Sequence, residues 1–201
     1  MSAFGVYPYH RHWLGVCDIS SGVGCLYCLF VLQVAKTSVW DKLMQWPALF
    51  FMDLSGNREL LDRTLVAFFA SRNAPPEALD LATRWAQEIA QTDKVVISGF
   101  HSPIERAVLD ILLAHDCSVV VTLGRSLYHK IPAYLQTAYN NNRVLFISFR
   151  DYSRQSRSNS QIRNWATADL ASELIFAPFD STSQLSTLHF TYSANSTILG
   201  Q

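Results

Sequence analysis

The sequence predicts an α/β fold: a Rossmann-like domain with a mostly parallel sheet of five or more strands and helices on both faces. Two observations lead to this prediction. From residue 48 onward, short unbroken apolar runs, which are typical of strands buried on both faces, alternate with longer segments of helical periodicity. Apolar residues make up 49% of the chain and charged residues 16%, which is enough for a buried core. Strands and helices that alternate at this spacing form βαβ units, and such units build a parallel sheet.

The predicted strands are five short apolar runs, at residues 65–70, 95–97, 119–123, 144–147 and 174–177. Another apolar run, at 49–52, ends in a turn formed by Ser55-Gly56-Asn57.

Helices are predicted between these runs. Pro75-Pro76 opens the first and Pro103 the second, since proline is tolerated in the first turn of a helix. The third and fourth cover residues 131–139 and 161–171. Residues 150–160 are polar and basic, so we predict a loop there.

Three parts of unequal character follow from these patterns. Residues 1–45 show no clean strand or helix periodicity. We expect a poorly ordered or loosely docked N-terminal arm there, for which an over-extended gene start is one explanation. A short buried helix over residues 25–36 is an alternative. Residues 46–180 are expected to form the Rossmann-like domain, and residues 181–201 a polar C-terminal tail.

A zinc site in the arm is a further alternative, because thiolate and imidazole suit that metal. Zinc sites usually offer two spaced pairs of ligands, whereas this segment has one cysteine pair between bulky apolar residues. We therefore expect no metal. The ligands of such a site would be His10, His12, Cys17, Cys25 and Cys28.

Charge and hydropathy give no sign of a membrane. Sixteen basic residues balance sixteen acidic ones, so any electrostatic footprint for nucleic acid has to be local. No signal-peptide pattern precedes the apolar run at residues 23–35, and this run is shorter than the ~20 residues that a membrane span needs. We expect a cytoplasmic protein with reduced thiols and no membrane partner.

Arginine is concentrated where strands end. In open parallel sheets the ligand lies beyond the carboxyl ends of the strands, and we refer to the loops there as the carboxyl-end loops. The starts of the following helices add partial positive charge and free N–H groups, which favour an anion. The arginines in or just after these loops are Arg72, Arg125, Arg150, Arg154, Arg157 and Arg163.

Several catalytic and cofactor motifs are missing. The chain has no G-x-G-x-x-G dinucleotide fingerprint after its first predicted strand, no phosphate loop of the G-x-x-x-x-G-K-[ST] type, and no G-x-S-x-G elbow. Glu105 is the only acid that lies beside two strand ends. We therefore expect a binding protein that is not an enzyme and has no cofactor.

Four stretches in chain order resemble motifs of the DNA-processing (recombination-mediator) family. A G-[ND]-x-E-L-L stretch at 56–61 precedes a strand that ends in Ala70-Ser71-Arg72, where the family has G-S-R. Residues 98–105 resemble S-G-x-x-x-G-I-D, residues 123–132 resemble L-G-x-G-L-D-x-x-Y-P, and residues 163–171 resemble R-N-R-x-I-A-x-L-S. The resemblance covers residues 46–180.

This resemblance implies a Rossmann-like domain that binds single-stranded DNA in a basic pocket and delivers it to a recombinase during DNA uptake or repair. After the fifth predicted strand the family continues with another helix and strand, where this chain has a Thr/Ser-rich segment; we expect a shortened or divergent member. The residues expected to bind nucleic acid or phosphate are Ser71, Arg72, Gly99, Phe100, His101, Gly124, Arg125, Lys130, Arg163 and Asn164.

Bases would stack on nearby rings, for which Phe100, Tyr128 and Trp165 are the candidates. The expected partners are single-stranded DNA or a nucleotide, with a second copy of the chain and a recombinase as candidate protein partners. Two other functions fit the same residues: a sensor of small nucleotides on a related fold, and a non-catalytic oligomerisation module. The P-G-G-x-G-T-x-x-E motif of related phosphoribohydrolases is absent.

Overall fold

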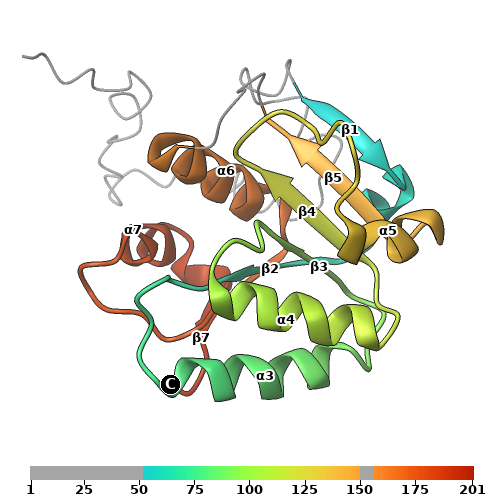
Figure 1. The fold of residues 1–201 in the computed structure, drawn as a ribbon. Coiled ribbons are helices and arrows are strands. Elements are labelled where there is room, and N and C mark those ends of the chain that lie inside the picture. Colours follow the sequence, from blue (N-terminus) through green and yellow to red (C-terminus); the bar gives the residue numbers. More distant parts are fainter. Residues whose placement is uncertain (1–51, 150–155) are drawn as a thin grey trace, which may run out of the picture. The chain divides into compact units, whose positions relative to one another are not determined.

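The computed structural model describes residues 52–149 and 156–201. A seven-stranded sheet in the order β1-β5-β4-β3-β2-β6-β7 lies at the centre of the fold (Figure 1). Its strands are β1 (Asp53–Gly56), β2 (Leu65–Phe69), β3 (Val95–Ser98), β4 (Val119–Leu123), β5 (Val144–Ser148), β6 (Glu173–Phe176) and β7 (Ser196–Ile198).

The sheet is parallel except at one edge. β1 pairs antiparallel with β5, with Asp53 opposite Ser148, whereas all the other neighbouring strands are parallel. β2 to β5 are wholly buried, as expected for unbroken apolar runs. The predicted fold class is thus confirmed, and the structure adds an edge strand on each side of the five that were predicted.

Helices cover both faces of the sheet (Figure 1). One face carries α3 (Ala78–Ile89), α4 (Pro103–Ala114) and α5 (Ala133–Asn140), whose buried side chains join those of the strands in one hydrophobic cluster. The other face carries α6 (Arg157–Leu170), α7 (Gln184–Thr191) and the short 3-10 helix η4 (Arg58–Asp62) over a second cluster. A second 3-10 turn, η5 (Ser193–Asn195), precedes β7.

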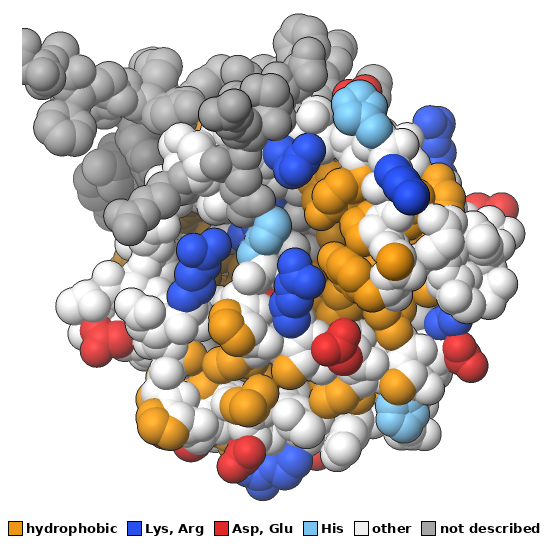
Figure 2. All heavy atoms as spheres, viewed as in Figure 1, with side chains coloured by type: hydrophobic (Ala, Val, Ile, Leu, Met, Phe, Trp, Pro, Cys, Tyr) orange, Lys and Arg blue, Asp and Glu red, His pale blue; other side chains and the backbone are white. Residues whose placement is uncertain are grey.

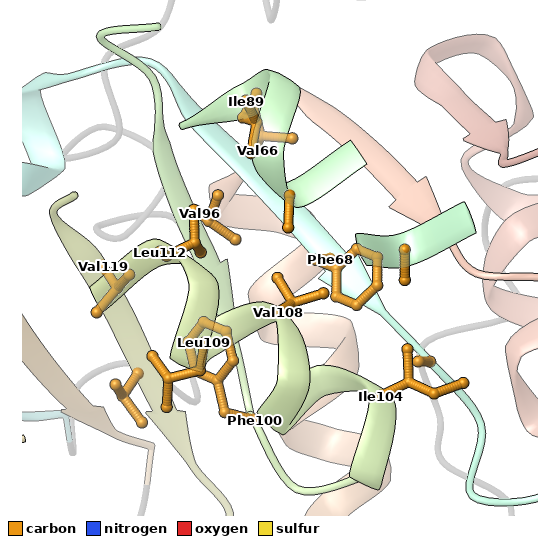
Figure 3. Packing of buried hydrophobic residues seen from close by; sticks show 14 of the residues in the cluster. Val66, Phe68, Ile89, Val96, Phe100, Ile104, Val108, Leu109, Leu112 and Val119 are labelled. Atoms are coloured by element: carbon orange, nitrogen blue, oxygen red, sulfur yellow. The ribbon is translucent and has the colours of Figure 1, made fainter. Parts of the chain in front are cut away.

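The core on the α3–α5 face is filled by aliphatic and aromatic side chains (Figure 3). Phe68 of β2 stacks on Trp85 of α3, with ring centroids 4.8 Å apart. Phe100 is also part of this cluster, only 4% exposed, and lies close to Leu109 of α4 (Figure 3).

Local capping explains where two helices begin. α4 starts at Pro103, as predicted, with a capping box in which Ser102 Oγ accepts from the Glu105 amide and Glu105 accepts from the Ser102 amide. α6 starts at Arg157, four residues before the predicted position of 161, because Ser156 Oγ caps it by accepting from the Asn159 amide. The predicted loop is therefore shorter than expected.

Residues 181–201 do not form the expected polar tail. α7 buries Leu185 and Leu188, and β7 adds a parallel strand beside β6, with Ser196 opposite Leu174. α7 has only a few apolar residues, which stand among serines and threonines. The amphipathic pattern is therefore weak, and the polar composition led to the prediction of a tail. The chain therefore has the additional helix and strand after its fifth predicted strand.

The expectations for residues 1–45, namely the arm, its alternative helix and the zinc alternative, lie outside the described residues. Arg150 and Arg154 lie outside them too. Among the residues that the structure describes, no helix has the length and hydropathy to cross a bilayer, and no group of histidine, cysteine and acidic side chains is placed to hold a metal ion.

Candidate nucleic-acid interface

The Arg163 guanidinium lies against Gly99 at the carboxyl end of β3. A Cβ atom at Gly99 would lie 2.4 Å from Cζ of Arg163, so the absence of a side chain makes the space that the guanidinium fills. Arg163 belongs to α6, on the opposite face from the helix that follows Gly99. Two residues far apart in the sequence, both expected in the site, are thus brought into contact.

Arg163 is buried with unused hydrogen-bonding capacity. The residue is 5% exposed. Nε and Nη2 donate to Oδ1 of Asn164 at 3.2 and 2.8 Å, but Nη1 has no acceptor among the described residues. Burial lowers the pKa of the guanidinium, yet arginine stays protonated in proteins. A buried cation with a free donor is costly unless an anion meets it.

The charge of Glu105 acts on this cation, and the Glu105 carboxylate is occupied by backbone amides. Oε1 accepts from the Ala70 amide at 3.2 Å, and Oε2 accepts from His101 and Ser102 at 2.7 and 3.1 Å. The negative charge of Glu105 favours the charged form of Arg163, but no ion pair joins the two side chains among the described contacts. The start of α4, expected to offer free N–H groups to a ligand, is already satisfied by Glu105.

His101 is a neutral imidazole within a positive environment. Burial, followed by the charges of Arg163, Arg106 and Arg72, lowers its pKa from 6.5 to about 4. Its Nε2 atom is buried and has no partner among the described residues. The charges of all three arginines act on this one ring, and we call Arg72, His101, Arg106 and Arg163 the basic cluster.

Basic side chains are visible on the surface in this region. Figure 2 shows Lys, Arg and His side chains gathered near the N-terminal end of α4, beside the carboxyl ends of the strands. Arg72 is exposed directly after β2, and the neighbouring Ser71 Oγ accepts from the Asn73 amide at 3.2 Å. The positive charge is therefore local in a chain that is neutral as a whole.

The segment after β4 contributes a second group of expected residues. Gly124 is buried beneath the first turn of α6, where a Cβ would lie 3.3 Å from the backbone of Asn159. Arg125 lies over the Tyr128 ring, 5.5 Å from its centroid, and its buried Nε has no acceptor among the described residues. Lys130 is exposed, and no described contact links it to the basic cluster.

The three rings proposed for base stacking differ in access. Phe100 is buried in the core, so it is not free to receive a base in this structure. Tyr128 is half-buried, with its ring edge-on to Phe146. Trp165 is half-buried at the α6–α7 side and lies 5.8 Å from the Tyr192 ring. Trp165 and Tyr128 therefore remain as stacking candidates.

Sequence reasoning missed the organising role of Glu105 and the contribution of Arg106. The signal for Glu105 was present, since Ser102-Pro-Ile-Glu105 has the spacing of a capping box. The contact of its carboxylate with Ala70 joins residues 35 positions apart and could not be read from the local pattern. Arg106 carries no motif and is found only through its place on α4.

Comparison with known proteins identifies the family. The sequence matches the family model of DNA recombination-mediator protein A over residues 36–199. The chain belongs to this family. The resemblance inferred from its four motifs is thereby confirmed.

Two solved structures of DNA processing protein A share the fold of this family member. The protein from Helicobacter pylori superposes with a TM-score of 0.60 at 19% identity, covering 75% of this chain and 72% of that one. The protein from Streptococcus pneumoniae gives a TM-score of 0.60 at 19% identity, covering 73% of this chain and 53% of that one. The match therefore spans about half the length of the Streptococcus pneumoniae chain. A search of curated proteins found no similar sequence.

Proposed function

We propose that this family member binds single-stranded DNA, holding the phosphate backbone in the basic cluster, and acts in DNA recombination, uptake or repair. The observation on which the proposal rests is the Nη1 donor of the buried Arg163 guanidinium, which has no acceptor among the described residues. Family membership and the described single-stranded DNA binding mode of the Helicobacter pylori protein support the choice of ligand.

The chemistry of the basic cluster favours a phosphate. Guanidinium groups present a rigid set of donors that suits phosphate oxygens. Arg163 offers Nη1, His101 offers a ring nitrogen that has no partner in the described part of the chain, and Arg72 adds exposed positive charge. Glu105 does not compete, because its oxygens are already occupied by three backbone amides. A bound phosphate would stabilise charges that are otherwise left uncompensated.

The recessed position of Arg163 favours a single strand over a duplex. Arg163 is 5% exposed and its Nη1 atom is buried, so a phosphate reaches this atom only when the surrounding side chains move. A single strand is flexible enough to bend toward such a position, whereas a duplex presents its phosphates on a stiff, convex surface. The proposal includes no catalytic step. Cytoplasmic localisation, a homodimer and delivery of the strand to a recombinase are further parts of it.

Titration of the purified protein with labelled single strand, duplex and mononucleotides at two salt concentrations tests this proposal. We expect the single strand to bind best. Arg72→Ala and Arg163→Ala should each weaken binding to every sequence, and each should flatten the slope of log affinity against log salt by up to about 0.7, the value for one phosphate contact. Arg163→Lys should retain part of the affinity, because it keeps the charge without the planar fork.

Arg58→Ala is the matched control, because Arg58 is an exposed arginine in η4, which precedes the amino end of β2, whereas Arg72 follows the carboxyl end of that strand. It should bind like the parent protein. Equal binding by the parent, Arg72→Ala and Arg163→Ala would refute the phosphate site. Preferential binding of mononucleotides would favour the nucleotide sensor instead.

A further inference from the structure

A small cavity lies between α6 and α7. Its volume is about 130 Å³. Sites for drug-sized ligands are typically ~300–1,000 Å³, so this cavity has room for one small ring and not for a whole nucleotide. Its lining residues are Gln161, Asn164 and Trp165 of α6 and Gln184, Thr187 and Leu188 of α7.

The lining combines an aromatic ring with carboxamides. Trp165 is half-buried and supplies an indole ring, while Gln161 and Gln184 are exposed and each offers both donors and an acceptor. A nucleobase has the complementary features, namely a flat π-face and an edge of donors and acceptors. An aliphatic ligand would leave these amides unmatched.

Asn164 connects the cavity to the basic cluster. Its Oδ1 accepts from Nε and Nη2 of Arg163, and the same side chain lines the cavity. The amide N–H groups of Asn164 have no acceptor within the described part of the chain. One side chain thus contacts the arginine that is proposed to hold the phosphate and also lines the cavity. A single residue thus connects the two proposed sites, just as a single sugar connects the base and the phosphate of a nucleotide.

We propose that the α6–α7 cavity receives a base of the single strand whose phosphate is held by Arg163. This inference rests on the proposed function and adds a place for a base to it. The site depends on α7, which supplies three of the six lining residues. Trp165 stacks on the base or flanks it, and Asn164 donates to its edge.

The test compares two labelled strands of roughly 16 nucleotides, near the upper end of single-strand site sizes. One is oligothymidylate and the other has the same backbone with abasic sugars. The parent should prefer the strand with bases by about tenfold, which is one typical base–aromatic stack. Thr187→Phe and Gln184→Phe place a ring in the cavity from α7 and should each remove this preference. Their salt dependence should stay that of the parent, since no phosphate contact is changed.

Gln87→Phe is the control, because it adds a ring at an exposed position of α3 outside the cavity. It should keep the preference. If both cavity-filling variants fold and still prefer bases, or if the parent binds the two strands equally, the base site is refuted while phosphate binding stands. If the parent binds neither strand, the proposed function itself fails.

Discussion

The Arg163 guanidinium fills the space that a side chain at Gly99 would need: its Cζ atom lies 2.4 Å from the position that a Cβ atom at Gly99 would take. The atoms in conflict belong to the far end of a flexible side chain and not to the backbone. Arg163 can therefore keep this position only if residue 99 is glycine, and a larger residue there would disturb the proposed binding site more than the fold.

Gly99→Ala should consequently lower the affinity for DNA without lowering the stability of the fold. The added methyl group displaces the guanidinium, so affinity for single-stranded DNA should fall about as far as in Arg163→Ala, whereas the denaturation midpoint should change little. The double variant should bind no worse than Arg163→Ala alone, because both changes remove one interaction. Additive losses in this double-mutant cycle would contradict the idea that Gly99 acts through Arg163.

Glu105→Gln should destabilise the protein. The carboxylate accepts from amides on both of its oxygens, whereas the carboxamide replaces one acceptor with an N–H₂ donor. Leaving a buried donor unsatisfied costs about 1–3 kcal/mol, and the loss should appear as a lower free energy of unfolding in urea. Glu88→Gln, at an exposed position of α3, should unfold like the parent.

The histidine of the basic cluster gives a pH dependence with a definite sign. The folded pKa of His101 is about 4, below the ordinary 6.5, chiefly through burial. Between these values the unfolded chain holds more protons, so the stabilisation is complete above about pH 6.5 and is lost as the pH falls toward 4. The melting temperature of the parent should therefore drop more between pH 7 and pH 5 than that of His101→Asn. Equal drops would show that His101 is not held neutral.

Removal of residues 181–201 should disrupt the fold. The deletion takes away α7 with the buried Leu185 and Leu188, each worth about 1.5–3 kcal/mol of burial, and uncovers β6 by removing β7. We expect a chain that is aggregated or melts many degrees lower, as measured by circular dichroism. A truncated chain that melts like the parent would mean that these residues contribute little to the core.

The sheet was predictable because its strands are buried on both faces. Runs such as 65–69 and 119–123 are almost wholly apolar, and strands that are buried on both faces typically have that pattern. β1 and β7 escaped prediction because edge strands are short and half-exposed, so their sequences, DLSG and STI, resemble turns or loops.

The site was predictable in its location but not in its internal arrangement. The topology of a parallel sheet brings the residues after β2, β3 and β4 to one edge, which is why Arg72, Gly99 and Gly124 were expected near one another. The contact between Arg163 and Gly99 depends on how α6 crosses the opposite face. The burial of Phe100 depends on its backbone, which adopts a φ of 49°. Neither feature has a signature in local periodicity.

The Glu105 carboxylate also ties together two strand ends, since it receives amides from Ala70 after β2 and from His101 and Ser102 after β3. The loops that contain Arg72 and His101 are thereby held in fixed positions relative to each other before a ligand binds. A site that is preorganised in this way has little conformational entropy left to lose on association. Selectivity among ligands would then arise from their fit to a fixed spacing of charges, with little adjustment by the loops.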